Sequence, residues 1–468
     1  MKLKNYFQLS ILFLVIISTI FFGFTGENEK KRFHLDKSYL YESYPLDINR
    51  IYLPFNNNGV FGDIITPQGN GGKYDNIDFL FSGGFLMAGY IYPGEFKQQV
   101  WANGVITTYR IVDYQPGTIG MSPDDERAKI YILKSSDPPF SQSWQEWKKA
   151  VELGAEFYDG DNDGIYNPVD KNNNGIWDYD EDRPNLIGDF TAWFVYNDGV
   201  PKEERRMYSE PLGVEIQQTI WAYSSINKLS NSIFTRYKIT FKGSPNFPDL
   251  IKLDSVVFSF VNDFDLGNYL DDLAGTDTLL KSMYCYNQLD DRDFGNNPPA
   301  IFSQLLQGPQ VSIPGVTFID NNGNKIFDTG DTPLTSARSF INPMDIRIIP
   351  GSMNLELSST NARFANEAIT DWTPYTVWYF LNALSPSGEI RNPCTFTYGQ
   401  VVGGVNCNQV NHKFIFSGDP ISNRGWINTT PFDVVTFLNT GRFTLEKDKP
   451  VELKIFPGFP DQIYSVII

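Results

Sequence analysis

Apolar and polar residues alternate along several short segments of the chain. In segments 214–222, 236–241 and 451–455, most apolar residues stand two positions apart, with polar or charged residues between them. Because side chains point alternately to the two faces of a β-strand, this pattern predicts half-buried antiparallel strands. Apolar runs without alternation predict strands buried on both faces, at Ile130–Leu133, Val256–Val261 and Val377–Leu381. We therefore expect a mainly β protein built from antiparallel β-sandwich lobes.

One segment has helical periodicity instead. Trp144, Trp147 and Val151 recur at intervals of three or four residues, which places them on one face of a helix. Ser143 and Glu146 have the spacing of a capping box, in which each side chain binds a free amide of the first turn. We expect one short capped helix whose tryptophans pack against the β core. Ligand binding by the tryptophans is the alternative.

Composition agrees with a β-rich globular protein. Aromatic residues make up 15% of the chain, and large aromatic side chains favour pleated surfaces. The 468 residues exceed the about 250–300 residues that a single hydrophobic core supports, so we expect two lobes or one elongated sandwich. The expected regions are a signal peptide (1–25), an N-terminal β region (26–142), a helix with tandem calcium loops (143–185), a β region with acidic loops (186–345) and a C-terminal β region (346–468).

The N-terminus has the pattern of an export signal. Lys2 and Lys4 precede the mostly apolar run Ile11–Phe24, which is shorter than the about 20 residues of a membrane span. We expect Sec export, a mature form without a membrane span, and a secreted or cell-surface location; an uncleaved anchor is the alternative. The net charge of −17 repels phosphate backbones and attracts cations, which argues against nucleic-acid binding.

Three cysteines follow the export signal. Disulfides persist in exported proteins, and a bond between Cys394 and Cys407 would close a short loop that contains three glycines. Unlinked, partly buried thiols are the alternative. Cys285 stands between two tyrosines and is expected on a strand.

Two fused acidic loops are the sharpest chemical feature of the sequence. Calcium takes about six to eight oxygen ligands, which flexible loops supply from acids and amides at alternate positions. The first loop has candidate ligands at its first, third, fifth, ninth and twelfth positions: Asp159, Asp161, Asp163, Asn167 and Asp170. The second loop begins on the same aspartate and fills these positions with Asp170, Asn172, Asn174, Asp178 and Glu181. A glycine at each sixth position permits the sharp turn.

The stretch Asp170–Glu181 matches the EF-hand loop pattern at every fixed position. Without cations the clustered acids would repel one another, so we expect Ca²⁺ as the bound ion; an Asn/Asp/Gly-rich turn without metal is the alternative. Segment Leu186–Tyr196 looks extended and not helical. The loops therefore lack the flanking helices of a calcium sensor, and we expect calcium to stiffen the chain.

A third loop has a similar spacing of candidate ligands, which are Asp320, Asn322, Asn324, Asp328 and Asp331. Lys325 stands at the sixth position, where glycine is expected, so an ordinary hairpin loop is the alternative. A further acidic stretch fits no loop template and is expected to be solvated, with calcium binding as the alternative: Asp263, Asp265, Asp271, Asp272 and Asp277.

The spacing in the tandem loops resembles thrombospondin type 3 repeats, in which successive acidic loops wrap calcium ions. Nearly all of the expected mature chain also resembles a group of large, mostly uncharacterised secreted proteins of bacteria that use type IX secretion. The stretches that carry the second resemblance are FSGGFLMAGYI (81–91), SDPPFSQSWQEWKKAVELGAEFYDGDNDGIYNPVDKNNNGIWDYDEDRPNLIGD (136–189), DFDLGNYLDDLAGTDT (263–278), FSGDPISNRGW (416–426) and GRFTLEKDKPVELKI (441–455). The resemblance implies β modules and export, and often a C-terminal sorting domain, but no assigned reaction. The sequence stops at Ile468, within the last expected strand, before such a domain would follow.

The sequence offers few catalytic candidates. The two histidines are His34, near the expected mature N-terminus, and His412, before an expected strand at Lys413–Phe416; both are read as non-catalytic. There is no G-x-S-x-G, H-E-x-x-H or P-loop motif. A glycosidase needs only two suitably spaced carboxyl groups, so this activity stays open. The tryptophans that could stack on sugar, although core packing is expected for each, are Trp372, Trp378 and Trp426.

We therefore expect a calcium-stabilised, non-catalytic protein that acts in adhesion, envelope structure or polymer binding. Its expected partner is a polysaccharide or a cell-surface protein. A carboxylate-based extracellular glycoside hydrolase is the alternative. A subunit of a larger extracellular assembly is a third hypothesis, and an exposed strand edge at Val451–Ile468 would support it.

Overall fold

The computed structural model describes residues 41–92, 98–224, 228–342, 345–364, 367 and 372–459. The predicted signal peptide at 1–25, the cleavage site that follows it and His34 lie outside these residues. The described strands and helices belong to the compact unit Glu42–Ile468.

The first of two large antiparallel sheets has ten strands. Its main path runs in the order β1-β2-β3-β4-β14-β27-β24, with β5 and β28 pairing with β4 and β14, and β6 pairing with β5. The strands are β1 (Ser43–Asp47), β2 (Ile51–Asn56), β3 (Gly72–Tyr74), β4 (Ile77–Ile91), β5 (Gln99–Ile106), β6 (Ile111–Val112), β14 (Lys252–Phe264), β24 (Leu357–Arg363), β27 (Val434–Thr440) and β28 (Phe443–Glu446).

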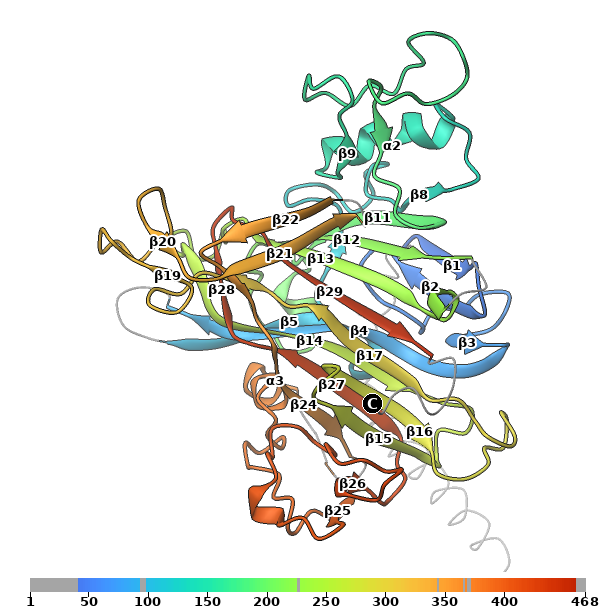
Figure 1. The fold of residues 1–468 in the computed structure, drawn as a ribbon, viewed down its shortest axis with the longest axis vertical. Helices are drawn as coiled ribbons and strands as arrows, with labels where there is room; N and C mark the ends of the chain where they lie inside the picture. The colour runs from blue at the N-terminus through green and yellow to red at the C-terminus, as the bar shows by residue number, and fades with distance from the viewer. Residues whose placement is uncertain are drawn as a thin grey trace, which may run out of the picture. The chain divides into compact units, whose positions relative to one another are not determined.

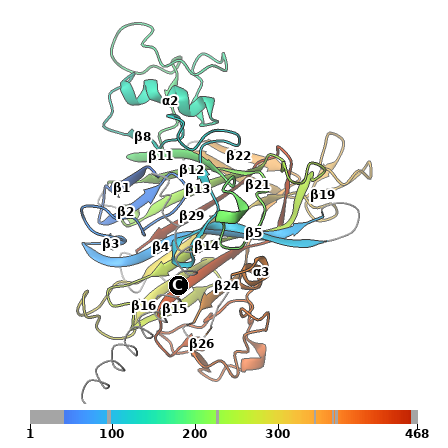
Figure 2. The ribbon, with the colours of Figure 1, turned by 180° about the vertical axis from the view of Figure 1, so that it is seen from behind.

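The second sheet has nine strands in the order β15-β16-β17-β29-β13-β12-β11-β7, with β8 also pairing with β11. Its strands are β7 (Gln115–Pro116), β8 (Tyr131–Lys134), β11 (Phe190–Asn197), β12 (Val214–Ala222), β13 (Ile233–Phe241), β15 (Asp272–Asp277), β16 (Ser282–Asn287), β17 (Ile301–Gln307) and β29 (Val451–Gly458). Both sheets combine strands from early, middle and late parts of the chain (Figures 1 and 2). The predicted mainly β, antiparallel class is confirmed, and the regional boundaries stay predictions.

The main hydrophobic core lies between the two sheets. Phe85 of β4 stacks on Phe258 of β14 with ring centroids 5.4 Å apart, and it contacts Tyr196 of β11 at 6.2 Å. Tyr237 of β13 lies 5.0 Å from Phe258. All four rings are fully buried. Aromatic side chains from facing sheets thus interdigitate, which is the packing of a β-sandwich.

Strand β12 confirms the alternating pattern at 214–222 but is more buried than expected. Ile216 and Ile220 pack in the core, and Glu215 and Thr219, which alternate with them, are also buried. Glu215 is covered from outside the sheet, where it accepts a hydrogen bond from the amide of Ile119 at 3.0 Å. The alternating pattern therefore predicted the position of the strand. It did not predict that other segments would cover the outer face of the strand and bury its polar residues.

The predicted helix at 143–154 is α2, Gln142–Glu152. Trp144 and Trp147 are buried in a cluster with Trp193 of β11, as predicted for tryptophans that pack on the β core. The capping box is wrong, because the N-cap is Ser141 and no side chain caps the helix. Ser143 instead donates to Asp137 at 2.9 Å.

The apolar run Val377–Leu381 forms helix α3, Pro374–Leu381, so the strand predicted there is wrong. Thr373 caps this helix by accepting a hydrogen bond from the Thr376 amide at 3.1 Å, and Pro374 suits the first turn. A short apolar run buried on all sides has no periodicity that separates helix from strand. The helix packs on the first sheet in a second apolar cluster with residues of β4, β5, β14 and β27.

Strand β29 lies between β13 and β17 and pairs with both. It pairs with β13 over 451–455 and with β17 over 454–458, so β29 is an interior strand and does not offer the exposed edge that would support the assembly-subunit hypothesis. Residues 460–468 lie outside the described part of the chain.

The remaining strands form two-stranded antiparallel sheets outside the two large ones. They are β9 (Phe157–Tyr158) with β10 (Arg183–Pro184), β18 (Gln310–Val311) with β23 (Met353–Asn354), β19 (Phe318–Ile319) with β20 (Thr332–Pro333), β21 (Ser336–Asn342) with β22 (Asp345–Pro350), and β25 (Gly399–Val402) with β26 (Gly425–Asn428). Short 3₁₀ turns lie at Thr107–Tyr109, Lys202–Glu204, Lys228–Asn231 and Cys407–Gln409. A disulfide joins Cys394 to Cys407, and Cys285 is a buried free thiol on β16.

Candidate cation-binding loops

Short antiparallel strand pairs close the base of each predicted calcium loop. Tyr158 of β9 pairs with Arg183 of β10, which brackets the fused loops at 159–182. Ile319 of β19 pairs with Thr332 of β20, which brackets the third loop at 320–331. The ends of each loop are therefore held side by side, so that residues distant in sequence can share one site.

The three loops have the same internal hydrogen bonds. The first residue of each loop, Asp159, Asp170 or Asp320, accepts a hydrogen bond from the amide of the sixth residue, at 2.9, 2.7 and 2.8 Å respectively. The side chain of the fifth residue accepts from the amide of the seventh, at 2.7 Å in every loop. These bonds curl the loop so that the side chains at its first, third and fifth positions can converge.

The sixth residue of each loop has a left-handed backbone. Its φ is +77° at Gly164, +75° at Gly175 and +65° at Lys325. Glycine adopts this conformation without steric cost, whereas an L-residue pays about 1–2 kcal/mol. The third loop therefore reaches the same turn without the expected glycine.

The closing position reveals a residue that the linear pattern did not find. The twelfth residue of the second loop, Glu181, accepts hydrogen bonds from the amides of the second and ninth residues, at 2.6 and 2.9 Å. Asp331 does the same in the third loop, at 2.9 and 3.1 Å. In the first loop the corresponding amides donate to Asp182, at 3.0 and 2.7 Å. Asp182 thus occupies the closing position that the sequence assigned to Asp170, which begins the second loop.

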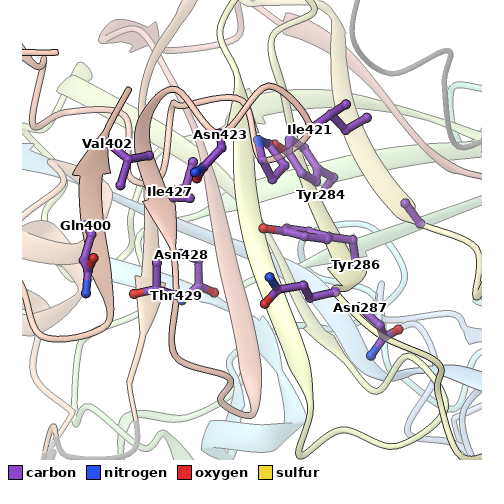
Figure 3. A pocket seen from close by; sticks show the side chains of 13 residues that line it. Tyr284, Tyr286, Asn287, Gln400, Val402, Ile421, Asn423, Ile427, Asn428 and Thr429 are labelled. Atoms are coloured by element: carbon purple, nitrogen blue, oxygen red, sulfur yellow. The ribbon is translucent and has the colours of Figure 1, made fainter. Parts of the chain in front are cut away.

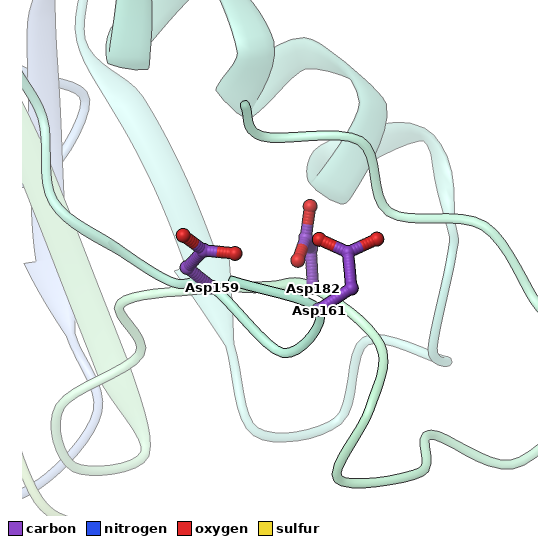
Figure 4. Close-up of side chains that lie close together, drawn as sticks. All are labelled: Asp159, Asp161 and Asp182. Atoms are coloured by element: carbon purple, nitrogen blue, oxygen red, sulfur yellow. The ribbon is translucent and has the colours of Figure 1, made fainter. Parts of the chain in front are cut away.

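Asp182 joins two aspartates of the first loop in one cluster of carboxylates. Carboxylate oxygens of Asp159, Asp161 and Asp182 lie within 4.8 Å of one another (Figure 4). Asp182 and the neighbouring Glu181 are 2% and 1% exposed, whereas Asp161 lies at the surface. No spacing rule predicts Asp182 for the first loop, because the whole second loop separates it from Asp170 in the sequence.

The other predicted ligands of the second and third loops contact one another through side-chain hydrogen bonds. In the second loop, the amides of Asn172 and Asn174 donate to Asp178 at 2.8 and 3.0 Å. In the third loop, Asn322 and Asn324 donate to Asp328 at 3.1 and 2.6 Å. Side chains at the third, fifth and ninth positions therefore meet in both loops.

The first loop differs from the other two because lysines approach its predicted ligands. Lys148 of α2 donates to Asn167 at 3.2 Å, and Lys171 donates to Asp161 at 3.2 Å. The hydrogen bond from Lys171 holds the pKa of Asp161 below its usual value. Asp163 accepts from the amide of Ile165 within its own loop.

Helix α2 anchors the fused loops to the sandwich. The indole of Trp147 donates to the Glu156 carbonyl at 3.0 Å, just before the first loop. The Tyr166 hydroxyl, inside the first loop, donates to the Trp144 carbonyl at 3.0 Å. The two tryptophans that bury one face of α2 thus also hold the loop in place through backbone contacts.

A second group of carboxylates lies where β14 ends and β27 begins. Oxygens of Asp263, Asp265 and Asp433 lie within 4.8 Å of one another. Asp263 is buried and accepts a hydrogen bond from Thr108 at 2.7 Å. Burial, with a smaller contribution from the nearby Asp433, raises the pKa of Asp263 well above its usual value and that of Asp265 to about 7.

The other members of this acidic stretch have ordinary structural roles. Asp272 accepts a hydrogen bond from the Leu266 amide at 3.0 Å, and its burial raises its pKa to about 8. Asp271 accepts from Asn287 at 2.8 Å. Asp277 accepts from two amides of the turn that follows β15.

The tryptophans considered for sugar stacking and the remaining histidine do not lie in a binding site among the described residues. Trp372, Trp378 and Trp426 are 6%, 7% and 1% exposed, so they pack in the core and do not present a face for sugar. His412 lies in a turn, and the strand expected at Lys413–Phe416 is reduced to an isolated bridge between Phe414 and Thr360.

A comparison with protein-family models matches no family, and a comparison with curated proteins finds no similar sequence. Within the described residues, no helix is long and apolar enough to cross a membrane.

Proposed function

We propose that the protein is exported and calcium-stabilised, and that it acts without catalysis at the cell surface or in the surroundings, in adhesion, envelope structure or polymer binding. One observation carries this proposal: three loops in two separate parts of the chain share the same hydrogen bonds at their first, fifth and closing positions. The resemblances to thrombospondin type 3 repeats and to secreted proteins of bacteria with type IX secretion support it.

The donor set suits a hard divalent cation. Each loop offers side-chain oxygens at alternate positions, and its bound ion would also use a main-chain carbonyl at the seventh position, which calcium accepts readily. The closing carboxylates of Glu181 and Asp182 are buried beside other acids. A cation would relieve the repulsion among these charges, and the relief would exist only in the folded chain.

The test is thermal unfolding of the mature protein with calcium and with a chelator. A ligand that binds only the folded state adds about 2.7 kcal/mol to the free energy of unfolding at a hundredfold excess over its dissociation constant. We expect the melting temperature to rise by several degrees with Ca²⁺, and by less with Mg²⁺, which prefers stricter octahedral geometry. Equal melting temperatures with calcium and with chelator would show that the loops are ordinary turns.

A carboxylate-based glycoside hydrolase is the second candidate. Carboxyl oxygens of Asp263, Asp265 and Asp433 all lie within 4.8 Å of one another, so this group gathers more than the two carboxyl groups that a glycosidase needs. Burial also raises the pKa of Asp263, as a general acid requires. Release of reducing ends from polysaccharides would support this candidate if Asp263→Asn abolished it. Wild-type protein that releases none would count against it.

A further inference from the structure

A pocket of about 690 Å³ opens between strand β16 and the β25–β26 hairpin (Figure 3). Its volume lies within the range of about 300–1,000 Å³ that is usual for small-ligand sites. Tyrosine side chains of β16 form one wall, and amide and aliphatic side chains of the hairpin and its connecting loop form the other. The pocket is far in sequence from the cation-binding loops and shares no residue with them.

The aromatic wall consists of Tyr284 and Tyr286, whose ring centroids lie 5.7 Å apart with a tilt of 45°. Burial raises the pKa of both phenols, so both stay neutral. Gly275 of the neighbouring strand β15 makes room for the first ring: a Cβ at this position would lie 2.1 Å from Tyr284 Cζ. The glycine thus permits the Tyr284 ring to lie across the adjoining strand.

The opposite wall offers hydrogen-bonding groups that are not used inside the protein. The exposed side chains of Gln400 and Asn423 make no hydrogen bond to the rest of the described chain. Oδ1 of Asn287, on the tyrosine side, is buried and also has no partner among the described residues. The exposed side-chain amides of Gln400 and Asn423 each provide donors and an acceptor, so they can bind hydroxyl groups of either orientation.

The hairpin wall is held firmly in place. Asn428 accepts a hydrogen bond from the Ala274 amide of β15 at 2.8 Å, and donates to the carbonyls of Tyr398 and Thr430 at 2.6 and 2.9 Å. The Cys394–Cys407 disulfide encloses β25 within its loop. The two walls therefore keep their separation without a ligand, which lowers the entropy cost of binding.

The pocket has no charge to offer. None of the described residues that line it is acidic or basic, although charged residues make up 20% of the chain. A charged ligand would lose hydration there without gaining an ion pair. Flat aromatic rings beside free amides suit a neutral molecule with an apolar face and many hydroxyl groups.

We propose that this pocket binds a neutral oligosaccharide segment, with a sugar ring against Tyr286 and its hydroxyl groups on Gln400 and Asn423. The exposed side chain of Ile421, 56% exposed at the rim, would extend the contact surface beyond the pocket. This inference names a ligand class for the polymer-binding role proposed above and rests on that role. Because no carboxylate lines the pocket, the bound sugar stays uncleaved there.

The experiment is isothermal titration of the mature protein, in calcium, with hexasaccharides of neutral glucans and mannans and with hexa-uronates as the charged comparison. We expect saturable binding of at least one neutral oligosaccharide and no comparable binding of the uronates. Tyr286→Ala should weaken binding about tenfold or more, which corresponds to about 1.4 kcal/mol. Tyr375→Ala, which removes a 54% exposed tyrosine of α3, is the matched control and should bind as the wild type does.

A second variant keeps the test decisive if Tyr286→Ala misfolds. Asn423→Asp alters an exposed residue and places a charge in the pocket, so it should also weaken binding. No saturable binding of any neutral oligosaccharide, equal binding of uronates, or wild-type binding by both variants would overturn the proposal. Melting temperature with and without calcium, measured on the same samples, separates this failure from failure of the calcium proposal. Recovery of shortened sugar from the Asp263→Asn variant as well as from the wild type would show that the pocket is catalytic and would overturn the proposal too.

Discussion

At the scale of single residues, Asp182 closes the first loop, a role that residue spacing in the sequence did not predict. Its two carboxylate oxygens accept hydrogen bonds from Gly160 and Asn167, at opposite ends of the first loop. It is almost completely buried and lies beside two other aspartates. The residue that closes the first loop therefore comes after the end of the second loop in the sequence.

We expect Asp182→Asn to destabilise the protein and to reduce its response to calcium. An amide side chain keeps one acceptor oxygen, so a partly buried backbone amide of the loop loses its partner, at a cost of up to about 1–3 kcal/mol. Melting temperature should fall in chelator, and the rise on adding calcium should shrink. Asp180→Asn, an exposed acid two residues away, is the matched control. Identical calcium responses in the two variants would contradict the role given to Asp182.

The buried carboxylates of the second group predict a pH dependence. Burial raises the folded-state pKa of Asp263 above its unfolded value of about 3.9. The folded chain therefore holds a proton that the unfolded chain releases, and stability falls as pH rises from about 4 through the folded pKa. Asp263→Asn removes this ionisation. In chelator, the variant should gain stability relative to wild type at pH 8.5 and should gain less at pH 5.

Urea unfolding at the two pH values measures this difference. Chelator is needed because a cation bound to the group would favour its charged form. A variant whose stability relative to wild type is the same at pH 5 and pH 8.5 would show that Asp263 ionises without penalty.

At the scale of elements, the disulfide between Cys394 and Cys407 stabilises the region that contains the β25–β26 hairpin. It closes a loop with a sequence separation of 13 residues. Constraint of the unfolded chain by a loop of this size contributes about 3 kcal/mol. We expect the double substitution Cys394→Ser and Cys407→Ser to lower the melting temperature and to expose this region to proteolysis.

Reduction of the wild-type protein is the control for that variant. Reduction should produce the same melting temperature as the double substitution, because the third cysteine, Cys285, is a buried free thiol and takes no part in the disulfide. If reduction leaves the melting temperature unchanged, the disulfide contributes nothing measurable.

The elements that the sequence predicted well have strong local signals. Alternation predicted β12 and β13, and the tryptophan spacing predicted α2. These patterns are informative because a strand repeats every two residues and a helix about every 3.6. Val377–Leu381 carries no such signal, since a helix buried by neighbours on several sides is apolar on every face. There the useful marks are Thr373 and Pro374, a cap and a first-turn residue.

The candidate sites also differ in whether a local sequence pattern predicts them. Fixed spacing predicted the residues of the second and third loops, which the structure brings together at each loop. Spacing could not find Asp182 or the approach of Asp433 to Asp263, because tertiary pairing of distant segments creates both. The tyrosine and amide pocket has no sequence signature, since its walls come from strands more than a hundred residues apart in the chain.

At the scale of the whole molecule, the two sheets are assembled from distant parts of the sequence. In the first sheet β14 pairs with β4 on one side and with β27 on the other. In the second, β29 lies between β13 and β17. Such non-local pairing makes folding slow, because loop-closure entropy is lost before the contacts form.

The position of β29 determines when the second sheet can be completed. Until this late strand is available, β13 and β17 lack their common neighbour and the second sheet remains in two parts. A chain that is still being threaded through a translocation channel, with residues 451–458 held back, could not complete the sandwich prematurely. The order of strands therefore delays completion of the second sheet until the end of the chain is free; under the export proposed above, this delay would keep the polypeptide unfolded during passage.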